Sequence, residues 1–119
     1  MARVIKPGDA KDLGLKGRVS KEIISGSLGS DSVTLRLVEI PPEIDGEMDR
    51  QPHFHRDTEE CIYVLSGKGA FCTENQELSL AAGDTVLVPK IEPHFTRNTG
   101  KEPLVLLCFF PVFELQSHG

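Results

Sequence analysis

The chain has 119 residues and a formal net charge of −5, with 39% hydrophobic and 26% charged residues. This length allows one domain with one hydrophobic core, and the composition is ordinary for a soluble globular protein. The acidic balance argues against nucleic acid or an anionic membrane as the main partner, because both need a basic footprint. We find neither an apolar run long enough to span a membrane nor an apolar N-terminal signal segment, so we expect a cytoplasmic protein.

The cysteine content favours a reduced protein. Three cysteines, Cys61, Cys72 and Cys108, stand among apolar neighbours. An odd number without close pairing is not a disulfide framework. We therefore expect buried thiols, in preference to a metal-binding or redox role for these cysteines.

The first part of the chain predicts short strands separated by turns. Strands are expected over residues 4–6, 18–25 and 33–40, with a turn at 7–9, a loop over 26–32 and an acidic, turn-rich segment over 43–51. Within the third strand, Val33, Leu35 and Leu37 alternate with Thr34 and Arg36. The two sets are therefore expected on opposite faces of a sheet.

A histidine pair follows this region. His53 and His55 share one face of a strand by parity, so both imidazoles can reach one point. Glu60 comes five residues after His55 and would face the other way on an unbroken strand. Residues 56–59 must therefore turn or bulge if Glu60 is to join the histidines. Three imidazoles, with His94 as the third, and one carboxylate suit a first-row divalent metal.

The second part of the chain again alternates strand and turn signals. Strands are expected over residues 61–65, 70–73, 77–80, 85–88, 94–99 and 104–113, with a hairpin connection at 66–69 and turns at 74–76 and 82–84. The run over 104–113 is apolar apart from one proline, which predicts a strand buried on both faces. His94, Thr96 and Asn98 fall on one face of their strand. Because no amphipathic helix is evident, we predict an all-β sandwich or barrel.

With these residues in place, the chain resembles a cupin. The first cupin motif combines a glycine, two histidines one residue apart, a glutamate and a later glycine. Here His53, His55, Glu60 and Gly67 match it, and the spacing to Gly67 selects Glu60 over Glu59. Gly46 stands for the leading glycine, one position further from His53 than in the usual pattern.

The second cupin motif is also present. Gly83, Pro89, His94 and Asn98 match its glycine, proline, histidine and asparagine. The glycine that normally stands two residues after the proline is Ile91 here, so the turn before His94 is expected to differ. The resemblance extends over about residues 33–113.

The resemblance implies a jelly-roll β-barrel, also called a double-stranded β-helix. It implies one cupin domain over residues 1–119, with its barrel over about 33–113, and it suggests a homodimer. It further implies one divalent transition metal per chain, of iron, manganese, nickel, zinc or copper, held by four residues: His53, His55, Glu60 and His94. An uncompensated cluster of this kind would be costly to bury, and a cation offsets that cost.

Four further residues have two interpretations each, and a fifth, His118, has one. Glu59 is either an exposed neighbour of the ligand set or a group that orients a histidine, and it is the nearest candidate for a general base. Asn98 either caps the turn that follows it or supports the site. Arg50 and Arg97 either pair with an anionic substrate or lie in solvent. We expect His118 to belong to a disordered tail and not to the ligand set.

Two classes of function follow. The first is a metal-dependent enzyme of dioxygenase, decarboxylase or isomerase type, acting on a small hydroxy-, keto- or dicarboxylic acid or a diketone. The alternative is a non-catalytic module in which the metal anchors a sugar or an acid for binding or sensing. Turnover distinguishes them, because a ligand of the second class binds and never changes.

Overall fold

The structure is a computed structural model and describes residues 1–44, 51–115 and 117–118. In these residues the helical segments are two short 3-10 turns, and none has the length and hydropathy that crossing a membrane requires. The elements are η1 (Pro7–Asp9), β1 (Lys11–Asp12), β2 (Val19–Ile24), η2 (Gly26–Leu28), β3 (Thr34–Ile40), β4 (Phe54–His55), β5 (Glu60–Ser66), β6 (Lys68–Thr73), β7 (Glu77–Ala81), β8 (Thr85–Val88), β9 (His94–Asn98), β10 (Leu104–Phe110) and β11 (Ser117–His118).

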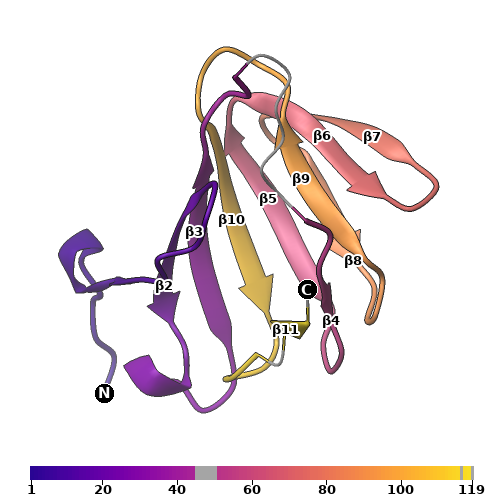
Figure 1. The fold of residues 1–119 in the computed structure, drawn as a ribbon. Helices are drawn as coiled ribbons and strands as arrows, with labels where there is room; N and C mark the ends of the chain where they lie inside the picture. The colour runs from indigo at the N-terminus through magenta and orange to yellow at the C-terminus, as the bar shows by residue number, and fades with distance from the viewer. Residues whose placement is uncertain (45–50, 116, 119) are drawn as a thin grey trace.

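Within the described residues the strands form three antiparallel sheets with jelly-roll architecture, which confirms the predicted all-β fold. The largest sheet has the order β1-β2-β3-β10-β5-β8, a second has the order β7-β6-β9, and β11 pairs with β4. Figure 1 shows β3, β10 and β5 running side by side, with the sheet of β6, β7 and β9 beyond β5. The chain-distant neighbours in this order, such as β3 beside β10, bring N- and C-terminal segments into one sheet.

The core lies on the inner face of the large sheet. On β10, Leu104, Leu106 and Phe110 are buried, while Val105, Leu107 and Phe109 on the outer face are partly exposed. The prediction that residues 104–113 form a strand buried on both faces is therefore wrong, and the strand ends at Phe110. The reason is that the second sheet covers one face only, as is common for antiparallel sheets.

The link between β5 and β6 also differs from the prediction. Residues 66–69 were expected to join two paired strands as a hairpin, but β5 belongs to the large sheet and β6 to the three-stranded one. Gly67 makes this corner with φ of 86°. A Cβ atom at Gly67 would lie 2.6 Å from the Pro103 carbonyl oxygen, so the chain needs glycine both for conformation and for space.

The two ends of the chain required further corrections. Residues 4–6 form no strand, and Val4 is 75% exposed because no sheet covers this segment in the described part of the chain. The tail was expected to be disordered at His118, but its backbone pairs with Phe54 in the β11–β4 ladder. The predictions for Gly46 and Arg50, and most of the acidic segment over 43–51, lie outside the described residues.

Candidate metal centre

Two of the candidate ligands are tied together through their backbones. His53 and His94 form an antiparallel bridge, in which each backbone N–H donates to the other residue's carbonyl oxygen at 2.9 Å. His55 follows on β4, and its carbonyl oxygen accepts a hydrogen bond of 2.8 Å from the Ile91 N–H. The start of β9 is thereby fixed against the histidine pair, and the three rings lie together.

Glu60 joins the histidines because the strand is interrupted, as the sequence predicted. Bends at Arg56 and Asp57 and a non-strand stretch separate β4 from β5, which begins at Glu60. Within this segment, the buried Thr58 hydroxyl donates to the Glu59 carbonyl oxygen at 2.8 Å. The bend changes the parity of the chain, so that the Glu60 side chain turns inward, where it is 5% exposed.

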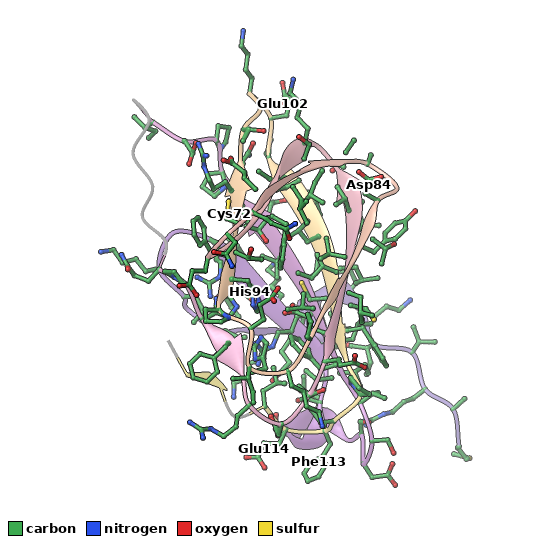
Figure 2. All side chains as sticks on the ribbon, turned by 90° about the vertical axis from the view of Figure 1, so that its right-hand side faces the viewer. Cys72, Asp84, His94, Glu102, Phe113 and Glu114 are labelled. Carbon is green, nitrogen blue, oxygen red and sulfur yellow. The ribbon has the colours of Figure 1, made fainter. Side chains whose placement is uncertain are left out.

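The four side chains converge on one point. One ligand atom from each of His53, His55, Glu60 and His94 can be chosen so that all lie within 4.8 Å of one another. Glu60 Oε1 is 3.4 Å from His55 Nε2 and 3.3 Å from His94 Nε2. Figure 2 shows His94 near the middle of the molecule, with Glu102 at one end and Phe113 and Glu114 at the other. The cluster thus lies inside the fold and not at either end.

Neighbouring groups set the orientation of the rings. His94 Nδ1 lies 2.8 Å from the Glu92 carbonyl oxygen, which can only accept, so Nδ1 carries the proton and Nε2 offers its lone pair to the cluster. The Phe71 ring stacks on the His94 ring at a centroid distance of 5.4 Å and an angle of 23°. The Phe110 ring meets His55 edge to face at 5.0 Å. These contacts hold the imidazoles before any ligand arrives.

The electrostatics of the cluster fit a bound cation. Burial alone would raise the pKa of the Glu60 carboxyl, but the adjacent His55 and His94 outweigh it and lower the pKa to about 2. Although Glu60 Oε1 is at ion-pair distance from His94 Nε2, neither atom makes a hydrogen bond within the described structure. Buried polar atoms are rarely left in this state. An ionised carboxylate and imidazole lone pairs aimed at one point are the donor set that a transition metal ion requires.

The cluster forms one wall of a cavity of about 50 Å³. Apolar side chains from the large sheet and from the N-terminal segment make up much of the rest, β9 contributes Thr96, and two arginines contribute charge. The lining residues are Leu15, Arg18, Ser20, Arg36, Val38, His53, His55, Glu60, Ile62, His94, Thr96, Leu106, Cys108 and Phe110. Arg18 and Arg36 were not predicted from the sequence as residues of the site. Arg18 has the parity of the buried residues Ser20 and Glu22 on β2, and that alternation could have indicated it.

The other candidates lie away from the cavity. Glu59 is exposed and does not line it. Arg97 forms ion pairs with Glu43 at 2.9 Å and with Glu77 at 2.7 Å. Asn98 caps the turn that follows it, since its Oδ1 accepts from the Gly100 N–H at 2.8 Å.

The turn before His94 was expected to differ because Ile91 replaces a glycine, but the backbone at Ile91 keeps a conformation typical of glycine. The φ of Ile91 is 71°, and Ile91 is the non-glycine residue with a positive φ in the described chain. A β-branched side chain is strained in this left-handed region, where glycine would be relaxed. The turn thus keeps a conformation that suits glycine although the sequence carries isoleucine.

Comparison with known proteins places the chain in a family. The model of the cupin domain family matches residues 36–110, which is more than half of the chain. The chain therefore belongs to the cupin family. This confirms the resemblance that the two histidine-containing motifs indicated.

Individual relatives are enzymes of different kinds. The chain is 36% identical over 74 residues to a glucose-6-phosphate isomerase of Pyrococcus horikoshii, a match that covers 56% of this chain and 39% of the isomerase. It is 35% identical over 86 residues to oxalate decarboxylase OxdC of Bacillus subtilis, covering 68% of this chain and 21% of that protein. Matches to the first curated relatives span about half of their length or less, at 45%, 52% and 39%.

A solved structure supports the fold. The oxalate decarboxylase of Lactobacillus farciminis, in a formate complex, superposes with a TM-score of 0.81 at 24% identity. The superposition covers 94% of this chain and 34% of that protein. At this identity the likeness establishes the jelly-roll fold and nothing more specific.

Proposed function

We propose that this chain is a metal-dependent cupin enzyme that acts on a small oxygenated substrate. In this proposal His53, His55, Glu60 and His94 hold one divalent transition metal. The observation that carries it is the convergence of four ligand atoms within 4.8 Å, with Glu60 Oε1 and His94 Nε2 buried and making no hydrogen bond. Relatives that are isomerases and decarboxylases support an enzyme.

The residues of the site would have different roles in this function. Bound there, the ion would supply Lewis-acid or oxygen-activating chemistry at positions left open by four protein ligands. Glu60 contributes the negative charge, and its low pKa keeps it ionised at any physiological pH. The His94 Nδ1–H bond to the Glu92 carbonyl keeps the second ring nitrogen available to a metal. Ile62, Leu106 and Phe110 surround the site with apolar surface and limit the access of water.

Glu59 stays the candidate general base. It is adjacent in sequence to a ligand, but it is exposed and outside the cavity lining, so it would have to reach the substrate from the 56–59 segment. A Glu59→Gln variant tests this role separately from metal binding. If Glu59 is the base, the variant keeps the metal and loses turnover; if turnover is unchanged, Glu59 has no such role.

The enzyme is tested by turnover. Protein purified without a histidine tag is loaded with iron, manganese, nickel, zinc or copper and incubated with small hydroxy-, keto- and dicarboxylic acids and diketones. We expect oxygen uptake or product formation with at least one combination, and none with His55→Gln. A compound that binds the loaded protein and is recovered unchanged with every metal would favour the alternative, a binding or sensing module.

The remaining features of the proposal concern the whole molecule. We propose that residues 1–119 form one domain, that the protein is cytoplasmic and that it is a homodimer. The outer face of the large sheet supports the dimer, since Tyr63, Leu87 and Phe109 are exposed there on the neighbouring strands β5, β8 and β10. Light scattering on Leu87→Lys tests it: we expect a monomer, and an unchanged mass would contradict this surface.

A further inference from the structure

The two arginines that line the cavity differ in how their charge is compensated. Arg36 forms an ion pair with Glu22 at 3.2 Å, and its guanidinium carbon lies 5.6 Å from the centroid of the Phe110 ring. Arg18 lines the same cavity from the position just before β2. In the part of the chain that the structure describes, its guanidinium donates to the Lys16 carbonyl oxygen at 3.3 Å and pairs with no carboxylate.

The guanidinium of Arg18 therefore keeps N–H donors available for a ligand in the cavity. The group is planar, remains charged and has five N–H donors, most of which are unused here. Arg18 is half-buried, and burial lowers the pKa of its side chain; Arg36 lowers it further, while Glu60 acts in the opposite direction. A carboxylate brought into the cavity would satisfy the donors with two parallel hydrogen bonds.

The net charge of the cavity also favours an anionic ligand. Arg36 and Glu22 cancel one another, and the imidazoles are neutral when they bind a metal. A divalent ion beside the ionised Glu60 would leave one positive charge, and Arg18 adds a second. The filled site would therefore attract an anion, and a neutral ligand would leave Arg18 uncompensated.

We propose that Arg18 anchors the carboxylate of the substrate, and that the substrate is a small carboxylic acid. This inference rests on the proposed function, since the metal would hold another oxygen of the same molecule. It excludes neutral sugars and diketones as the main ligands. A cavity of about 50 Å³ has room for on the order of four water molecules, which corresponds to a compact acid.

The test compares a charged probe with a neutral one on cobalt-loaded protein. Malonate needs Arg18 in the proposal, whereas imidazole needs only an open position on the metal. Both are titrated while the visible absorption of the cobalt site is recorded. The variants are Arg18→Gln, Arg18→Lys and the control Lys21→Gln, which removes one positive charge from an exposed position on the adjoining strand β2.

We expect Arg18→Gln to weaken malonate binding by about tenfold to a hundredfold, the size typical of losing hydrogen bonds to a charged group. Imidazole binding stays unchanged. Arg18→Lys keeps the charge without the two-pronged geometry and loses less. Lys21→Gln alters neither probe. Equal malonate affinity in Arg18→Gln and wild type would overturn the inference, as would a parallel loss of both probes.

The proposed function and this inference can fail separately. If the protein takes up neither cobalt nor any of iron, manganese, nickel, zinc and copper, the metal proposal fails, and malonate binding to the metal-free protein is then measured by calorimetry. Binding that depends on Arg18 keeps the carboxylate anchor. Binding that ignores Arg18, or no binding, overturns it.

Discussion

Each end of β9 places a buried polar residue on the same inner face of the strand. The two residues differ in how fully their side chains are hydrogen-bonded. At one end Asn98 is 1% exposed, and its side chain donates to the Ile40 and Glu102 carbonyl oxygens at 2.9 and 2.7 Å and accepts from Gly100. At the other end His94 is 2% exposed, and its Nε2 makes no hydrogen bond within the described structure.

This difference in hydrogen bonding distinguishes a residue that stabilises the fold from residues that are suited to bind a ligand. Burying a polar group that is fully hydrogen-bonded fixes the fold, because breaking the network costs free energy. Burying ligand atoms that face one another without hydrogen bonds costs free energy in the empty protein, and a bound ion recovers it. Asn98 is thus a structural residue, whereas we propose that His94 and Glu60 bind a metal ion.

The largest expected effect is the loss of metal affinity when a ligand beside His94 is replaced. Glu60→Gln removes the negative ligand but keeps its shape, so we expect at least about a hundredfold weaker binding, beyond the loss caused by supporting residues alone. The fold should persist because glutamine keeps the volume of this buried side chain, while the metal-free variant loses the stability that ionised Glu60 gains from His55 and His94. Metal competition with a chelator and circular dichroism measure both. Retention of one ion per chain at wild-type affinity would show that Glu60 is not a ligand.

A substitution at Asn98, at the other end of β9, should lower the free energy of unfolding and leave metal binding unchanged. Asn98→Ala removes hydrogen bonds to Ile40, Glu102 and Gly100, and we expect a loss of about 2–4 kcal/mol in the free energy of unfolding. The folded fraction still takes one metal per chain. Denaturant titration and elemental analysis provide the two readings. Unchanged stability would show that Asn98 does not stabilise the fold. Loss of the metal from protein that is still folded would show that Asn98 takes part in metal binding.

Acid should destabilise the metal-free protein through Glu60. Its pKa is lowered from 4.5 to about 2 in the folded state, so the folded protein holds this proton less tightly than the unfolded chain. The resulting stability is present above the unfolded pKa and is lost as the pH falls from about 4.5 towards 2. Its size is at most on the order of 3 kcal/mol.

The matching control is Glu60→Gln, which cannot titrate. Urea unfolding of both metal-free proteins at pH 5, 4, 3 and 2.5 isolates the contribution of this carboxyl. The wild type should approach the variant as the pH falls. Parallel curves would mean that the imidazoles do not lower the pKa of Glu60.

The smallest effect concerns the turn before His94. Ile91 has φ of 71° and is 59% exposed, so its side chain contributes strain and little burial. We expect Ile91→Gly to raise the free energy of unfolding by about 0.5–1 kcal/mol, the relief of strain being partly offset by the flexibility of glycine in the unfolded chain. Ile91→Ala keeps a Cβ atom in the same conformation and serves as the control. Equal stability of the two variants would argue against strain at this position.

Much of the site followed from short-range patterns. The parity of His53 and His55, and the need for a bend before Glu60, come from the two-residue repeat of a strand, and the bend lies at residues 56–57. That His94 joins them depended on the family resemblance, because the bridge to His53 connects segments far apart in sequence.

The features that the sequence did not predict depend on how the strands and sheets pack against one another. The apolar run over 104–113 does not reveal that a second sheet covers one side only. The corner at Gly67 has the composition of a hairpin, and only the close approach of Pro103 distinguishes the two. Arg18 stands just before a strand, where its direction depends on how that strand is placed in the sheet.

The central claim is that four side chains from separated segments hold one ion, and anomalous diffraction from a crystal grown with manganese tests it most directly. We expect one anomalous peak per chain, about 2.0–2.3 Å from His53, His55, Glu60 and His94. A fully ordered chain with no peak between these residues, or a peak that only surface carboxylates bind, would contradict it.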